Sequence, residues 1–373
     1  MPALWLLALL HLYIGWRIAP SLPGAVAPGV FAAWLAASLL LIPAAVFGRR
    51  ARQRASADRW TWAGMLALGA FSMLLVLTLV REVVLLVAWL LPWTLPPLAA
   101  PTAAAVPLLA LAACVLGFAA ARRTARVREV EVPIAGLPAA LHGFTVVQIT
   151  DVHVGPTVKR AYVQAIVDAA NRLQADAVAI TGDLVDGRVA DLHGDVAPLA
   201  GLRSRHGTFF VTGNHEYYSG AAEWIAQLRS LGLQVLVNEH VVLRQGGAAL
   251  VMAGVADYNA AQVQPGQRSD PLAALAGAPA DAGLRLLLAH QPRSAPAAAA
   301  AGFDVQLSGH THGGQFWPWN LFVPLQQPYT AGLHRHGQLW VYTSRGTGYW
   351  GPPLRLGAPS EITRLRFVSE AGC

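Results

Sequence analysis

The sequence predicts an α/β protein in two parts, N-terminal transmembrane helices followed by an α/β layered domain. Two observations support this. The chain of 373 residues is 55% hydrophobic and only 13% charged, against a usual charged share of about 25%. The charge-poor part is N-terminal, because residues 1–121 hold only seven arginines and two acidic residues. After Pro133, short β-rich runs alternate with alanine-rich helical stretches, a pattern typical of α/β domains.

The transmembrane region is expected at 1–121. Three uncharged stretches in it are long enough to cross ~30 Å of hydrocarbon. A fourth, at the start, is shorter but ends in Trp16 and Arg17, an interfacial anchor pair. It lacks a basic start, so we expect an uncleaved helix rather than a signal peptide. Residues 83–98, with three prolines, are expected to extend the third helix or lie at the interface. The four expected helices are 1–18, 26–47, 60–80 (open to extension) and 99–121.

Arginine clusters predict the orientation. One cluster lies between the second and third helices (Arg49, Arg50, Arg52, Arg54, Arg59), and another follows the fourth (Arg122, Arg123, Arg126, Arg128). Both should be cytoplasmic, which predicts an integral protein of the cell inner membrane with a cytoplasmic C-terminal domain. The pI near 9.9 belongs to these flanks, since the chain from Glu129 onward holds 16 basic and 18 acidic residues. Membrane lipids are therefore expected partners, and nucleic acid is not.

The rest of the chain divides into a basic juxtamembrane linker with a first edge (122–142) and the α/β layered domain (143–373). Cys114 and Cys373 are the only cysteines, which excludes a disulfide framework and a thiolate zinc site. Helices are expected at 158–173, 221–231 and 294–301, and a short helix with a linker at 271–283. The expected strands are 144–150, 177–181, 208–212, 249–255, 284–289, 303–308, 339–343 and 362–367.

Polar groups that can bind metal follow five of these strands directly. If the strands are parallel, all five groups face one edge, where α/β sheets place ligands. Glycines beside several of them suit tight turns and let a substrate approach the backbone. The groups are Asp151 and His153, Asp183, Asn214 and His215, His290, and His310 and His312.

Pooled, these groups supply carboxylates, an amide and imidazoles, but no thiolate. The set is too rich in nitrogen for Ca²⁺ or Mg²⁺ alone. It suits two borderline divalent ions, Mn, Fe or Zn, that clamp the oxygens of a phosphoryl displacement. With two carboxylates and a bridging hydroxide the site keeps a positive charge, so an anionic phosphate ester is the natural substrate.

The order and spacing of the five groups resemble the calcineurin-like metallophosphoesterases over about Phe144 to Phe367. The helical N-terminus, the motif at 213–220 and Ser-Arg-Gly-Thr-Gly at 344–348 resemble the transmembrane group with a metallophosphoesterase domain. The resemblance implies a four-layer αββα sandwich with a double-sheet core. It also implies that Asp151, His153, Asp183 and His312 hold one metal, and that Asp183, as bridge, with Asn214, His290 and His310 holds the other.

The resemblance further implies that His215 is catalytic without being a metal ligand, pointing at the phosphate to stabilise the transition state or protonate the leaving oxygen. General chemistry agrees, because an imidazole beside such a site can donate a proton to an alkoxide. Glu216 is expected to support a ligand. Arg345 is equally consistent with a phosphate contact and with a structural salt bridge. Phe316, Trp317 and Trp319 suit an acyl-chain or base site, a lid on the membrane, or plain packing.

The predicted function is a membrane-anchored, metal-dependent hydrolase of phosphomonoester, phosphodiester or pyrophosphate bonds. A lipid-linked substrate is favoured because substrate and site would share the bilayer surface, and family resemblance suggests a UDP-diacylglucosamine-type lipid A precursor. Cyclic nucleotides and soluble phosphodiesters stay open. The alternative is a membrane sensor or scaffold that uses the phosphoesterase fold for docking or output. The presence of His215, which holds no metal and acts only in turnover, favours an enzyme.

Overall fold

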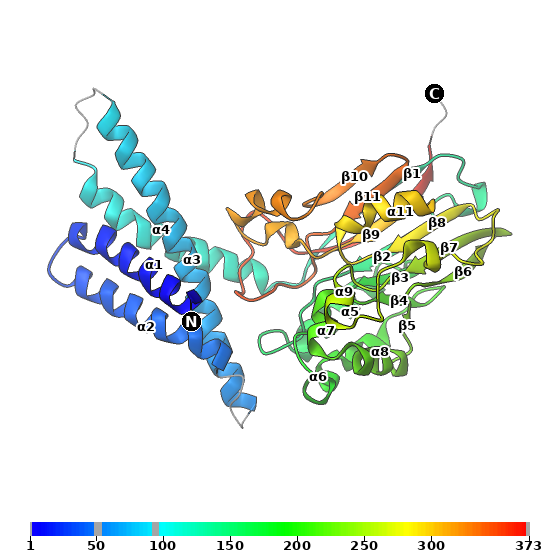
Figure 1. The fold of residues 1–373 in the computed structure, drawn as a ribbon, viewed down its shortest axis with the longest axis horizontal. Coiled ribbons are helices and arrows are strands. Elements are labelled where there is room, and N and C mark those ends of the chain that lie inside the picture. The colour runs from blue at the N-terminus through cyan, green and yellow to red at the C-terminus, as the bar shows by residue number, and fades with distance from the viewer. Residues whose placement is uncertain (1, 48–53, 92–96, 371–373) are drawn as a thin grey trace. The chain divides into compact units, whose positions relative to one another are not determined.

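The computed structural model describes residues 2–47, 54–91 and 97–370 (Figure 1). Arg49, Arg50 and Arg52 of the first arginine cluster, and Cys373, lie outside the described residues. The chain divides into two compact units, one of residues 1–122 with 351–356, and the other of 123–350 with 357–373. Each unit is described by itself below.

The first unit holds four helices long and apolar enough to cross a membrane. Residues 83–90, which are not expected to form a separate crossing, continue the third helix. Polar side chains tie the helices together. His11 Nε2 lies 3.1 Å from Ser38 Oγ, and Arg81 Nε donates to Thr102 Oγ1 over 3.1 Å. The helices are α1 (Pro2–Ile18), α2 (Ala27–Phe47), α3 (Arg54–Leu90) and α4 (Ala99–Ala121).

The second unit contains two six-stranded mixed sheets. The first has the order β1-β12-β2-β3-β4-β5, and the second β10-β11-β9-β8-β7-β6. In the first sheet, β2, β3 and β4 are parallel neighbours; in the second, β7, β8 and β9 are. The strands are β1 (Arg126–Ile134), β2 (Thr145–Ile149), β3 (Ala177–Thr181), β4 (Thr208–Val211), β5 (Gln234–Val235), β6 (Glu239–Gln245), β7 (Ala248–Gly254), β8 (Leu284–Leu288), β9 (Val305–Ser308), β10 (Gly332–His336), β11 (Leu339–Thr343) and β12 (Glu361–Ser369).

The core lies between the two sheets. Phe209 and Val146 of the first sheet are fully buried in one cluster with Leu286 and Leu307 of the second. Strands covered on both faces need continuous apolar runs, which is why short runs such as Val-Ala-Ile recur. A second cluster joins Leu287 to α11, which covers the outer face of the second sheet.

Helices α5, α6 and α8 lie on the side of the first sheet away from the second (Figure 1). The unit is therefore layered as helices, sheet, sheet and helices. Short helices interrupt the loops between strands. The helices of this unit are α5 (Arg160–Asn171), α6 (Val189–Val196), α7 (Asn214–Ser219), α8 (Ala221–Ser230), α9 (Ala260–Val263), α10 (Pro271–Ala274) and α11 (Ala295–Ala301).

All eight expected strands are present, and they are the eight interior strands of the two sheets. Three edge strands, β5, β6 and β10, are absent from the expectation, and β1 was expected only as an edge within 122–142. Helices α6, α7 and α9 are also absent from the expectation.

Candidate metal centre

The candidate metal ligands follow the carboxyl ends of parallel strands in both sheets. In the first sheet they follow β2, β3 and β4; in the second they follow β8 and β9. The sequence predicted that all five groups face one edge of a sheet. In the structure, strand ends from two sheets packed face to face form that edge. Residues more than 150 positions apart in the chain meet here, since His310 N–H donates to both carboxylate oxygens of Asp151 over 2.9 and 3.0 Å.

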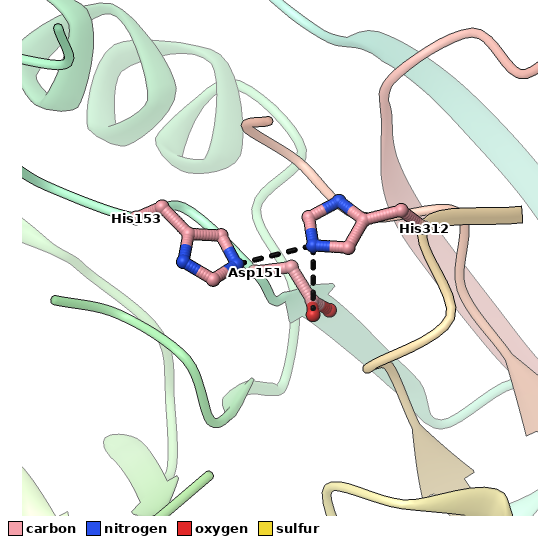
Figure 2. Close-up of side chains that lie close together, drawn as sticks. All are labelled: Asp151, His153 and His312. Carbon is pink, nitrogen blue, oxygen red and sulfur yellow. Dashed lines mark hydrogen bonds and ion pairs between the residues drawn. The ribbon is translucent and has the colours of Figure 1, made fainter. Parts of the chain in front are cut away.

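One group of ligands comes from β2 and β9 (Figure 2). Asp151, His153 and His312 point toward one another, and one ligand atom from each lies within 4.8 Å of the others. His153 Nε2 is 3.1 Å from His312 Nε2, and His312 Nε2 is 3.5 Å from Asp151 Oδ1. All three side chains are buried. Two imidazole nitrogens and a carboxylate that converge in this way suit a divalent cation.

A second group consists of Asp183, His290 and His310. His290 Nε2 lies 3.1 Å from Asp183 Oδ2 and 3.2 Å from His310 Nδ1. His290 Nδ1 is 2.8 Å from the carbonyl oxygen of Thr181, which fixes the ring so that Nε2 faces the group. Such an outer hydrogen bond is the usual support of a metal-binding histidine.

Asp183 lies between the two groups. Its Oδ2 is 3.1 Å from His290 Nε2 in the second group and 3.9 Å from His153 Nε2 in the first. The residue predicted to bridge two metals is thus the one whose carboxylate is close to both sets.

Asn214 supplies a test of whether a metal fits. Its Oδ1 is buried and receives no hydrogen bond from any residue that the structure describes. A buried acceptor without a donor is costly, and a cation at this atom would remove the cost. The surrounding donors are all oxygen or imidazole nitrogen, which Mn, Fe and Zn accept. The residues present therefore fit two divalent metal ions.

Two glycines let the carboxylates approach the backbone. A Cβ at Gly213 would lie 2.2 Å from Asp183 Oδ1, and a Cβ at Gly309 would lie 2.1 Å from Asp151 Oδ2. Any side chain at either position would collide with a candidate ligand. The expectation that these two glycines let a substrate approach the backbone is wrong, because a carboxylate of the chain already fills the space beside each of them.

The backbone at the site is unusual. Eight non-glycine residues of the described chain have positive φ, between 47° and 69°, and five of them are candidate ligands. The left-handed conformation costs an ordinary residue about 1–2 kcal/mol, and such strain gathers at functional sites. The five are Asp151, His153, Asp183, His310 and His312.

Asp186 is a site residue that sequence reasoning missed. Its Oδ1 lies 2.9 Å from His153 Nδ1 and 2.6 Å from His215 Nδ1, so one carboxylate holds both rings. Burial alone would raise the pKa of Asp186, but His153 and His215 outweigh it and hold that pKa far below its usual range. The signal in the sequence is an acid three residues after Asp183, in Gly-Asp-Leu-Val-Asp.

The side chain of His215 is more exposed than those of His153 and His290. Its side chain is 18% exposed, against 1% for His153 and 0% for His290. Burial lowers the pKa of His215, but the charges of Asp183 and Asp186 outweigh burial and raise the pKa to about 9. With Nδ1 held by Asp186, Nε2 is the nitrogen left to meet a substrate.

The pKa values of the candidate ligands are shifted in different directions. Burial raises the pKa of Asp151. Burial would also raise the pKa of Asp183, yet the histidines around it, His290 first, hold that pKa well below its usual range. Burial and the charge of His290 lower the pKa of His310 to about 3, so His310 is neutral at pH 7 and can bind metal without losing a proton.

Glu216 and Arg345 have structural roles. Glu216 accepts backbone N–H bonds from Gly213, Asp183 and Leu184 at 2.6, 3.0 and 2.8 Å, and so fixes the loops that carry two ligands. Arg345 Nη1 donates to Glu361 Oε2 over 3.0 Å. The structure therefore favours the salt-bridge interpretation of Arg345.

Comparison with known proteins identifies the family. The family model described as calcineurin-like phosphoesterase matches residues 144–314. A Bos taurus relative, "Transmembrane protein with metallophosphoesterase domain", is 42% identical over 262 residues, which cover 67% of this chain and 59% of the relative. An uncharacterized metallophosphoesterase of Helicobacter pylori J99 is 41% identical and covers 60% of each chain.

This chain thus spans about 60% of the length of those two relatives. It covers more of a third relative, an uncharacterized metallophosphoesterase of Aquifex aeolicus, which is 32% identical over 58% of this chain and 82% of the relative. The transmembrane relative and the four long apolar helices found among the described residues indicate a membrane protein. The family model and these relatives show that the chain belongs to the calcineurin-like phosphoesterase family.

Proposed function

We propose that this chain is a membrane-anchored hydrolase of phosphate esters that uses two divalent metal ions. The observation that carries the proposal is the place of Asp183, whose Oδ2 lies near the nitrogens of His153, His215 and His290 at 3.9, 3.9 and 3.1 Å. One carboxylate thereby adjoins both ligand groups and the histidine that is in neither. A structural metal site would have no use for that histidine.

Two divalent ions would neutralise phosphoryl oxygens and lower the pKa of bound water. The chain's own residues do the rest. Asp151, His153, Asp183 and His312 would hold one ion, and Asp183, Asn214, His290 and His310 the other. Asp186 holds His215 by Nδ1, which directs Nε2 toward the substrate. In its protonated form His215 could donate a proton from Nε2 to the leaving oxygen.

The proposed substrate is a lipid-linked phosphate ester or pyrophosphate, of which a UDP-diacylglucosamine-type lipid A precursor is one candidate. The support is the short connection between the helices and the second unit. Helix α4 ends at Ala121 and β1 begins at Arg126, so the second unit is tethered within a few residues of a membrane helix, which favours substrates held in the same membrane. The arginines at 122, 123, 126 and 128 support a cytoplasmic domain at the inner membrane.

The test uses the full chain in detergent, stripped of metal and resupplied with Mn²⁺. Hydrolysis of bis-p-nitrophenyl phosphate and of a UDP-linked acyl lipid is measured side by side for the wild type, His215→Ala and His193→Ala. His193 is an exposed histidine on α6 and serves as the matched control. We expect metal-dependent turnover that is lost in His215→Ala and kept in His193→Ala, with preference for the lipid.

Two outcomes would contradict the proposal. Turnover that survives in His215→Ala would remove its catalytic role. A wild type that binds two metal ions but hydrolyses neither substrate would favour the sensor or scaffold alternative. Equal rates on both substrates would keep the hydrolase and overturn only the lipid substrate.

A further inference from the structure

The segment from Phe316 to Gln327, here called the apolar segment, follows the candidate ligand His312 closely in the sequence and exposes large apolar side chains. Its two ends are buried, Phe316 at 7% exposure and Gln327 at 5%. Between them, five large side chains are 41% to 81% exposed: Trp317, Trp319, Leu321, Phe322 and Leu325. Packing therefore explains Phe316, but it does not explain the rest of the segment.

The apolar segment has regular local structure and is held by hydrogen bonds at both ends. Two 3₁₀ turns, Trp319–Leu321 and Val323–Leu325, form its middle. Gln315, just before it, exchanges two 2.8 Å hydrogen bonds with the backbone of Trp350. At the other end, Gln327 Nε2 donates to Gln291 Oε1 over 3.2 Å, and Arg293 donates to the carbonyl oxygen of Gln326. The fold thus holds both ends and presents the apolar side chains outward.

Charge is absent from the apolar segment and its surroundings in the sequence. Residues 313–333 contain no Asp, Glu, Lys, Arg or His, and residues 305–360 contain no acidic residue. A solvated loop of this length normally carries charge. Contiguous exposed apolar side chains without charge mark an interaction surface, and tryptophan is enriched where proteins meet the membrane interface.

The length of the connection to the helices favours lipid as the occupant. Only residues 122–125 separate α4 from β1, and four residues span at most about 14 Å. A unit attached so closely to a membrane helix meets lipid at a far higher effective concentration than it meets any dissolved partner.

We propose that the apolar segment inserts into the interfacial layer of the membrane that carries the chain's own helices. Phe316 follows His312, a candidate metal ligand, by four positions. Insertion would bring one loop of the metal centre to the lipid surface. Because the segment is uncharged, the insertion is driven by apolar contact and needs no anionic lipid.

The test places a fluorescent probe on the full chain in phosphatidylcholine nanodiscs. In a background of Cys114→Ala and Cys373→Ser, Leu325→Cys is labelled with the polarity-sensitive dye NBD. The matched control is Leu272→Cys, since Leu272 is a leucine of the same unit that is 71% exposed and lies in α10 (Pro271–Ala274). We expect a blue-shifted emission at position 325, and loss of most of that emission when spin-labelled phosphatidylcholine is included. Position 272 should show neither effect.

Other results would overturn the proposal. Emission at position 325 that resembles position 272 would show that the segment stays in water. A blue shift without quenching by spin-labelled lipid would show that protein, either the chain's own helices or a second copy, covers the segment. Quenching that requires anionic lipid or disappears in high salt would overturn the apolar mechanism. None of these readouts depends on phosphoesterase activity, so the test is independent of the proposed function.

Discussion

The two sheets meet at the metal centre but contribute different chemistry to it. The strands of the first sheet end in every carboxylate of the site and in its amide, whereas those of the second end in three histidines, His290, His310 and His312. The first half also supports itself, since Asp186 and Glu216 hold its rings and loops. In the second half, the pKa of His290 is raised against the effect of burial, chiefly by Asp183 of the first sheet, with a smaller contribution from Asp257 after β7. The first sheet is thus the framework, and the second sheet completes it.

The substitution Asp183→Asn is the strongest test of the claim that the first sheet is the framework of the metal centre. Because Asp183 adjoins both ligand groups, we expect loss of both metal ions. The substitution His310→Ala in the second sheet should remove one ion and leave the other. Metal content of the purified full chain by mass spectrometry measures both. If Asp183→Asn retained one ion, Asp183 would belong to a single group and would not be a bridge.

The pH dependence of the metal-stripped protein sharpens the comparison. The pKa of His215 is raised from 6.5 to about 9, so its interactions stabilise the fold fully below pH 6.5 and are lost as pH rises through about 9. At 1.36 kcal/mol per pKa unit this contribution is about 3 kcal/mol at most.

Denaturant unfolding of the metal-stripped wild type and His215→Ala measures that contribution. The stability difference between them should be largest near pH 6 and shrink toward pH 9.5. A difference that stays constant with pH would show that His215 is not charged by the acids of the first sheet.

Asp186→Asn tests the support within the first sheet. The amide keeps the Oδ1 oxygen that lies against both rings but loses the negative charge that holds His153 and His215. Loss of such a partner costs about 10–100-fold in metal affinity or activity. Titration with Mn²⁺ and the rate at saturating metal separate the two effects. Asp191→Asn, at an exposed acid paired with Arg188, is the control and should match the wild type.

The smallest effect is expected from His334→Ala. This histidine lies in β10 at the edge of the second sheet, where it stacks on Tyr329 and bonds the carbonyl oxygen of Ala331. We expect a stability change within ~0.5 kcal/mol and unchanged turnover. A large loss of turnover would show that the second sheet contributes more than the histidines at its parallel strand ends.

Sequence reasoning predicted interior strands well because burial on both faces demands continuous apolar runs, as in Leu-Leu-Leu-Ala before His290. Edge strands carry no such demand. In β6 the apolar run is only Val-Val-Leu, between polar residues, and most side chains are only partly buried. In β10 the sequence Gly-Leu-His-Arg-His has no apolar run.

The candidate ligands were predictable because each directly follows an interior strand. Asp186 was not, because it lies three residues further along and acts through a hydrogen bond to two rings from different loops. Only folding brings those rings together. Phe316 is buried whereas the large side chains after it are exposed, and this difference in burial likewise results from tertiary packing.

The left-handed backbone at five candidate ligands has a consequence for evolution in the laboratory. Glycine adopts this conformation without the penalty that Asp151, His153, Asp183, His310 and His312 incur. Selection that relaxed the backbone at these positions would therefore remove ligands of the metal centre. A stabilised variant of this chain should be sought elsewhere in the molecule, because the least relaxed part of its backbone is the part that its chemistry requires.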